Sequence, residues 1–119
     1  MAAPNIVNVA TITGKTAVQD VGTSPTAVVA NGAASGKVLK INCLYAGAVD
    51  AVANGLLTVD FYRGSTATEL IKKAIVPKQA ALTPVLKDGA LYLEEGDSLR
   101  VSASAVSTLK VICSYEEIS

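Results

Sequence analysis

A chain of 119 residues has room for one hydrophobic core, so we expect a single domain over residues 1–119. Ten basic and ten acidic residues give no net charge, and the basic residues are scattered, which argues against a nucleic-acid binder. Half of the residues are hydrophobic, yet no apolar stretch approaches the ~18 residues of a membrane span. So small and apolar a chain exposes apolar surface, which predicts contact with a partner or with further copies as a homo-oligomer.

The first expected strand, Asn5–Thr13, is apolar or small on both of its faces. Such a strand is expected to be covered on both sides, with a neighbouring subunit as one cover. It is also expected to add to the sheet edge of that subunit by β-augmentation. The candidate protein–protein contact therefore consists of Ile6, Val7, Val9 and Ile12. Met1–Pro4 carries no basic residue ahead of an apolar run, so we expect no secretory signal and folding in a cytoplasm, without obligatory disulfides.

Gly14 and Lys15 are expected to form a turn, followed by a short strand at Thr16–Val21. Gly22–Pro25 interrupts the chain, and Thr26–Ala30 is a further strand that ends at an Asn-Gly turn.

Two longer strands follow in the middle of the chain, Lys37–Ala46 and Leu56–Arg63. Strict alternation in the first predicts an inward face made of Leu39, Ile41, Cys43 and Tyr45, with Lys40 and Asn42 outward. In the second it places Leu57, Val59 and Phe61 inward and Thr58, Asp60 and Tyr62 outward. Asp60 is therefore expected at the surface, where a lysine across the strand is a suitable partner.

Gly64–Thr68 is expected to turn the chain, and residues 66–76 fit two patterns. A possible capping box and apolar spacings of three and four residues favour a helix, whereas alternation from Glu69 to Ile75 favours a strand. The strand is preferred because every neighbouring element is a strand. Gln79–Leu86 contains Pro84, which is typical of an edge strand or an extended connection.

The segment Asp88–Tyr115 shows the clearest alternation and predicts three short strands. Glu94–Asp97 is expected to be a hairpin turn. The inward residues of the three strands are Leu91 and Leu93, then Leu99, Val101 and Ala103, then Leu109, Val111, Cys113 and Tyr115. Eight or nine short strands with turns about every ten residues predict an all-β fold, an antiparallel β-sandwich that is Ig-like or jelly-roll-like.

The chain contains no histidine, which removes Ser-His-Asp and Cys-His arrangements and histidine metal sites. Cys43 and Cys113 are interpreted as buried thiols rather than as a disulfide or half of a metal site. Glu94, Glu95 and Asp97 offer oxygen ligands for a cation, but their spacing does not match an EF-hand loop. We therefore expect no catalytic, cofactor-binding or metal site, and no enzyme.

Three blocks of the chain resemble small virion structural proteins of tailed bacteriophages, especially phages of marine cyanobacteria. They are Met1–Lys15, the Val76-Pro77 junction with the strand that follows, and the C-terminal runs Leu91–Arg100 and Cys113–Ser119. These are strand and turn motifs, so the resemblance implies a structural role and no catalytic residues.

The resemblance implies a virion location, assembly in the host cytoplasm, and the major capsid protein or other virion proteins as partners. Absence of coiled-coil heptads or fibrous repeats favours a capsid decoration (cement) protein that binds the assembled head lattice. The alternatives are a neck, tail or fibre-associated protein, or a β-sandwich that binds a host surface or glycan.

Overall fold

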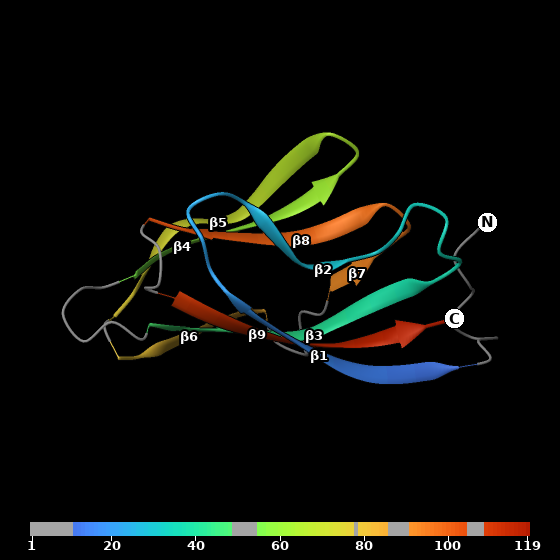
Figure 1. The fold of residues 1–119 in the computed structure, drawn as a ribbon, viewed down its shortest axis with the longest axis horizontal. Helices are drawn as coiled ribbons and strands as arrows, with labels where there is room; N and C mark the ends of the chain where they lie inside the picture. The colour runs from blue at the N-terminus through green and yellow to red at the C-terminus, as the bar shows by residue number, and fades with distance from the viewer. Residues whose placement is uncertain (1–10, 49–54, 78, 86–90, 105–108) are drawn as a thin grey trace.

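The computed structural model of the chain describes residues 11–48, 55–77, 79–85, 91–104 and 109–119, and their backbone forms two antiparallel sheets packed face to face (Figure 1). The described strands are β1 (Ile12–Asp20), β2 (Thr26–Ala30), β3 (Val38–Ala48), β4 (Gly55–Arg63), β5 (Thr66–Val76), β6 (Ala81–Val85), β7 (Leu91–Leu93), β8 (Asp97–Ala103) and β9 (Leu109–Ile118). This part of the chain holds no helix long and apolar enough to cross a membrane.

The pairing of the strands is that of a jelly roll. One sheet has the order β1-β9-β3-β6, with β7 also paired to β3, and the other has the order β2-β8-β4-β5. The strands therefore pair in a nested series, from β1 with β9 through β2 with β8 and β3 with β6 to β4 with β5, as in a long hairpin rolled into two layers. The predicted all-β sandwich is confirmed, and the topology distinguishes its jelly-roll form from an Ig-like one.

The core lies between the two sheets and is aliphatic. Alternation places buried side chains on the inner faces of β4, β8 and β9, where one face of each strand meets the opposite sheet. These inner residues are Leu57 and Val59, Leu99, Val101 and Ala103, and Leu109, Val111 and Cys113. The predicted inward faces of these strands are confirmed, with Phe61 and Tyr115 half-buried at the margin of the core.

The predicted turn at Gly14 and Lys15 is wrong, because β1 is one unbroken strand. It pairs with β9 at nine consecutive positions, from Ile12 opposite Ile118 to Asp20 opposite Lys110. Gly14 lies opposite Glu116 within this register, so it belongs to the strand and not to a bend.

The predicted inward placement of Cys43 and Tyr45 is also wrong, because β3 contains a bulge. Its register against β9 shifts between Ile41 and Cys43, so Asn42 is an extra residue and the alternation reverses after it. Leu44, Ala46 and Ala48 become the buried residues, whereas Cys43 is half-buried and Tyr45 exposed on the outer face.

Residues 66–76 form the strand β5, as preferred from the sequence, and the turn before it is shorter than predicted, because Thr66 already begins the strand. Two register shifts against β4 explain the helix-like spacing of its apolar residues. Beside one of them, Lys73 has a φ of 53°, and its N–H donates to Thr58 Oγ1 at 3.1 Å. The Thr58 hydroxyl thus replaces the strand partner that the Lys73 N–H loses at the bulge.

Lys73 provides a test of this bulge, because a left-handed φ is strained for lysine and free for glycine. Lys72, the exposed neighbour of Lys73 in the same strand, provides the control. We expect the Lys73→Gly variant to have a free energy of unfolding about 1 kcal/mol higher than that of the Lys72→Gly variant. Urea denaturation of the two variants measures this difference. Equal stabilities would contradict the left-handed conformation at position 73.

Candidate functional site

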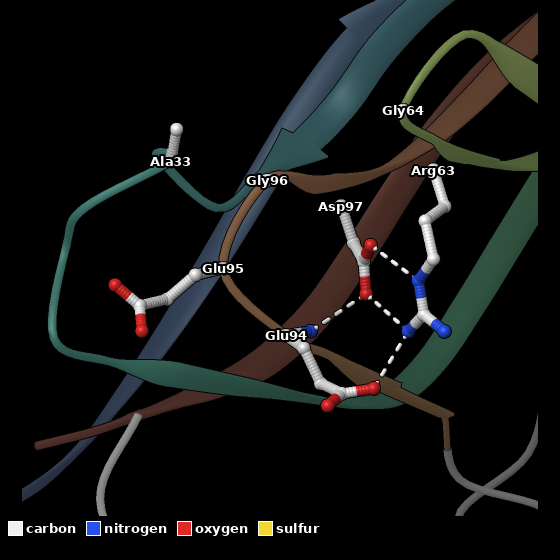
Figure 2. A pocket seen from close by; sticks show the side chains of 7 residues that line it. All are labelled: Ala33, Arg63, Gly64, Glu94, Glu95, Gly96 and Asp97. Atoms are coloured by element: carbon white, nitrogen blue, oxygen red, sulfur yellow. Dashed lines mark hydrogen bonds and ion pairs between the residues drawn. The ribbon is translucent and has the colours of Figure 1, made fainter. Parts of the chain in front are cut away.

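The most elaborate polar cluster lies at one end of the sandwich, where β4 ends and β8 begins (Figure 2). Arg63 donates through Nε to Asp97 Oδ1 at 2.8 Å and through Nη2 to Asp97 Oδ2 at 2.7 Å. The Glu94 N–H donates to the same Oδ2 at 2.9 Å, and Arg63 Nη2 also reaches Glu94 Oε2 at 2.6 Å. Asp97 is only 1% exposed, so its carboxylate is buried with each oxygen bonded.

This geometry sets the ionisation of both partners. The Arg63 guanidinium, followed by the Glu94 N–H, holds the pKa of the Asp97 carboxyl below its ordinary value, and outweighs the opposing effect of burial. The pKa of Arg63 is raised, chiefly by its hydrogen bonds to Asp97. The chain turns at Glu94–Asp97 as predicted, with Gly96 at a φ of 88°, and Asp97 is buried. The predicted hairpin is wrong, because β7 pairs with β3 whereas β8 lies in the other sheet, so this turn connects the two sheets.

Asn31 joins four segments beside this pair. Its Nδ2 donates to the carbonyls of Lys37 at 2.9 Å and Leu93 at 3.0 Å, and its Oδ1 accepts from Ser35 Oγ. Its backbone N–H donates to the Asp97 carbonyl at 2.8 Å. We call Asn31, Arg63, Glu94 and Asp97 the end cluster. Its bonds link the end of β2, the start of β3, the end of β7 and the turn into β8.

The end cluster borders an open depression of about 550 Å³, lined by Ala33, Arg63, Gly64, Glu94, Glu95, Gly96 and Asp97. Its carboxylates are the three acidic residues considered above as cation ligands. Asp97 and Glu94 are bonded to Arg63, and Glu95 accepts from the Gly36 N–H at 3.1 Å. Within the described part of the chain, no group of three His, Cys, Asp or Glu residues is arranged to hold a metal ion. The depression is built as a structural ion-pair site.

A second ion pair lies on the outer face of the same two strands, three residues along from the first, between Asp60 of β4 and Arg100 in the middle of β8. Arg100 donates to Asp60 through Nε at 2.8 Å and Nη2 at 3.0 Å, and its guanidinium lies 3.9 Å from the centroid of the Tyr62 ring. The predicted solvent exposure of Asp60 is wrong, since this residue is 4% exposed. It does face outward, but Arg100 from β8 covers it, and the cross-strand partner is an arginine and not a lysine.

An apolar row crosses the outer face of the first sheet. Ile112 of β9 lies directly opposite Val18 of β1 on one side and Tyr45 of β3 on the other. The three side chains share the face turned away from the core and are 45%, 72% and 48% exposed, in the order Ile112, Val18, Tyr45. We call these three residues the apolar row. Such contiguous apolar side chains on a flat sheet are suited to contact with another protein.

Of the candidate contact residues, Ile12 is the first residue of β1 and is 55% exposed, as a contact residue requires. Ile6, Val7 and Val9 lie outside the described residues. Sequence reasoning missed the apolar row because Val18, Tyr45 and Ile112 come from three distant segments. The bulge at Asn42, which turns Tyr45 outward, has no local sequence signal.

No protein-family model matches the chain, and no curated protein matches it in sequence. Among solved structures, a chain described as part of Bacillus endospore appendages, a family of disulfide-linked pili, has a similar fold with a TM-score of 0.53. The alignment covers 100% of this chain and 96% of that chain at 12% identity. This similarity supports the all-β sandwich architecture.

Removal of the Asp97 carboxylate tests the end cluster. We expect Asp97→Ala to lower the free energy of unfolding by about 2–3 kcal/mol, because three charge-assisted hydrogen bonds are lost and the Glu94 N–H loses its acceptor. Glu94→Ala, which removes an exposed carboxylate from the same arginine, is expected to cost about 0.5 kcal/mol or less. Denaturant unfolding at neutral pH measures the free energy of unfolding of both variants. Equal losses would contradict the central role of Asp97 in the end cluster.

The same comparison has a defined pH dependence. Because the folded-state pKa of Asp97 is lowered, its stabilising contribution is complete above the ordinary value of 3.8 and is lost as the pH falls through the folded-state value. The stability gap between the wild type and Asp97→Ala should therefore be constant near neutrality and close below about pH 4.

The two cysteines should differ in reactivity. Burial raises the pKa of the Cys113 thiol to about 12, and this residue is fully buried, whereas Cys43 is half-buried on the outer face. We expect a thiol reagent at pH 8 to modify Cys43 in the native protein and to reach Cys113 only after unfolding. Cys43→Ser should leave no fast-reacting thiol. A fast-reacting thiol in that variant would contradict the burial of Cys113.

Proposed function

We propose that this chain is a structural protein, a subunit that acts by binding to a larger assembly rather than by catalysis. The observation that carries the proposal is the apolar row, three exposed side chains aligned on a regular sheet face. The conspicuous buried acidic side chains, Asp60 and Asp97, are each held by an arginine and serve the fold. A scaffold of this kind offers surface, not reactive groups.

In its finer form the proposal is a capsid decoration protein of a tailed phage, with the major capsid protein as partner and the virion as location. The resemblance of the strand and turn blocks to small phage virion proteins supports this form. A decoration protein binds the assembled lattice and not the free capsid subunits, so its binding free energy stabilises the lattice at every occupied site. The sheet face and the start of β1 provide the contact, and weak contacts repeated by symmetry add up.

The fold similarity to a chain of pilus-forming appendages favours a second candidate, a subunit of a fibre. Such a subunit also works through repeated contacts between copies of a β-sandwich, so the two candidates share the structural role and differ in the partner. Fold alone does not determine function. The two candidates are therefore separated by whether the chain is present in purified particles at a fixed ratio to the capsid protein.

Quantitative mass spectrometry of purified particles, with the major capsid protein as the internal reference, tests the proposal. A decoration protein is expected in a simple ratio to the capsid protein. A few copies per particle would place the chain at the neck, tail or a fibre and exclude the decoration role. Absence from purified particles would overturn the virion location altogether.

A further inference from the structure

The four sheet edges of the described residues differ in how well they can accept another strand. In one sheet, β2 has five residues and a register shift against β8, and β5 has two shifts against β4 together with Lys72 and Lys73. In the other, the edge beyond β3 is formed by β6, which contains Pro84, and by the three-residue β7. Short strands, bulges, lysine and proline are the features by which proteins blunt their edges.

The remaining edge, β1, has no bulge and no proline, and its single lysine, Lys15, is held by Glu117 of β9 at 3.0 Å. Its nine residues pair with β9 without a register shift, and among the described residues no strand pairs with its other side (Figure 1). The hydrogen bonds fix which backbone groups are free. Thr11 and Ser119 exchange two bonds at 3.0 and 2.9 Å, and the Val21 N–H donates to Leu109. Odd-numbered residues thus bond to β9, and the N–H and C=O groups of Gly14, Thr16 and Val18 point away from it.

The apolar row meets this edge at Val18, its most exposed member at 72%. We propose that β1 pairs with β1 of a second copy of this chain in an antiparallel, two-fold symmetric contact centred on Val18. Val18 then lies opposite Val18 of the second copy, and Thr16 lies opposite Asp20. The two apolar rows join into one line of six side chains on the outer face of a continuous sheet that spans both copies.

Three features of the chain favour a second copy as the occupant. First, the centred register places even-numbered residues of β1 opposite even-numbered residues of the second copy. The backbone groups that point away from β9 in the two copies therefore face one another. Second, it places no like charges directly opposite, because Asp20 faces a threonine and is itself paired with Lys110. Third, the apolar row ends at the edge, and a two-fold contact at Val18 brings an identical row beside it, as the self-complementarity of an isologous interface requires.

This inference deepens the proposed structural role and rests on it, but the experiments separate the two. Sedimentation equilibrium of the wild type is expected to show a dimer. Val18→Lys places two like charges at the centre and should raise the dissociation constant by at least about tenfold. Thr16→Pro removes an N–H that makes no bond within its own sheet, so it should keep the fold and weaken the dimer.

Ile75→Lys provides the matched control, since Ile75 is 62% exposed on the opposite edge strand β5, and it should remain dimeric. Circular dichroism and melting temperatures verify that each variant is folded. A monomeric wild type, or folded Thr16→Pro and Val18→Lys proteins that dimerise as well as the wild type, would overturn the inference.

Cross-linking tests the register. In a Cys43→Ser background, Val18→Cys places two thiols in a directly opposed hydrogen-bonded pair, where the Cα atoms are about 5.5 Å apart and a disulfide fits. We expect mild oxidation to cross-link Val18→Cys and not Thr16→Cys, and the reverse result would overturn the register. A monomer present in particles at the expected ratio would refute the dimer alone, whereas a dimer absent from particles would refute the proposed virion role alone.

Discussion

A buried carboxylate is tolerated in a small aliphatic sandwich only where donors replace the water that it has lost. At Asp97 these donors come from two elements, the side chain of Arg63 at the end of β4 and the backbone of the turn before β8. The carboxylate therefore ties the turn to a strand of the same sheet. Asn31, bonded to the Asp97 carbonyl, extends the connection to β2, β3 and β7. The described loops at this end of the sandwich are held in place by these bonds.

The jelly roll depends on such ties because its pairing is nested. β1 and β9 are neighbours in the sheet but lie at opposite ends of the chain, so most of the fold is stabilised by contacts between distant segments. The aliphatic core drives the layers together without specifying which strand lies beside which. Directional polar contacts such as the Arg63–Asp97 and Arg100–Asp60 pairs add that specificity between β4 and β8.

Alternation in the sequence predicted the strands and most inward faces, because period-two patterning follows from burial of one face. It failed where the period is interrupted. In β3 the residues Ile41, Cys43 and Tyr45 fit one inward face as well as Ile41, Leu44 and Ala46 fit another, so no local pattern shows that Asn42 is an extra residue. In β5 the two bulges produced a spacing that also fits a helix, and only the neighbouring strands favoured the correct interpretation.

The end cluster could not be predicted for a different reason. Nothing near Asp97 in the sequence indicates that Arg63, 34 positions earlier, supplies its donors, and Asp60 is likewise covered by an arginine 40 positions away. The Glu94–Asp97 turn is a local feature and was predictable, whereas the burial of its last residue depends on the topology. The apolar row likewise depends on the topology, since only the register of three strands brings its members together.

The contrast between the edges limits how such a subunit can assemble. Edge pairing through β1 consumes the regular, unbulged edge of both copies, and the bulged or short strands at the other described edges do not offer another. A two-fold contact therefore closes at two copies and does not propagate into a fibril. Larger order, on a capsid lattice or along a fibre, then has to come from the sheet faces and loops. In the proposed decoration role, a closed dimer with exposed faces would meet a symmetric lattice at two places at once, which would strengthen its attachment without extending its own sheet.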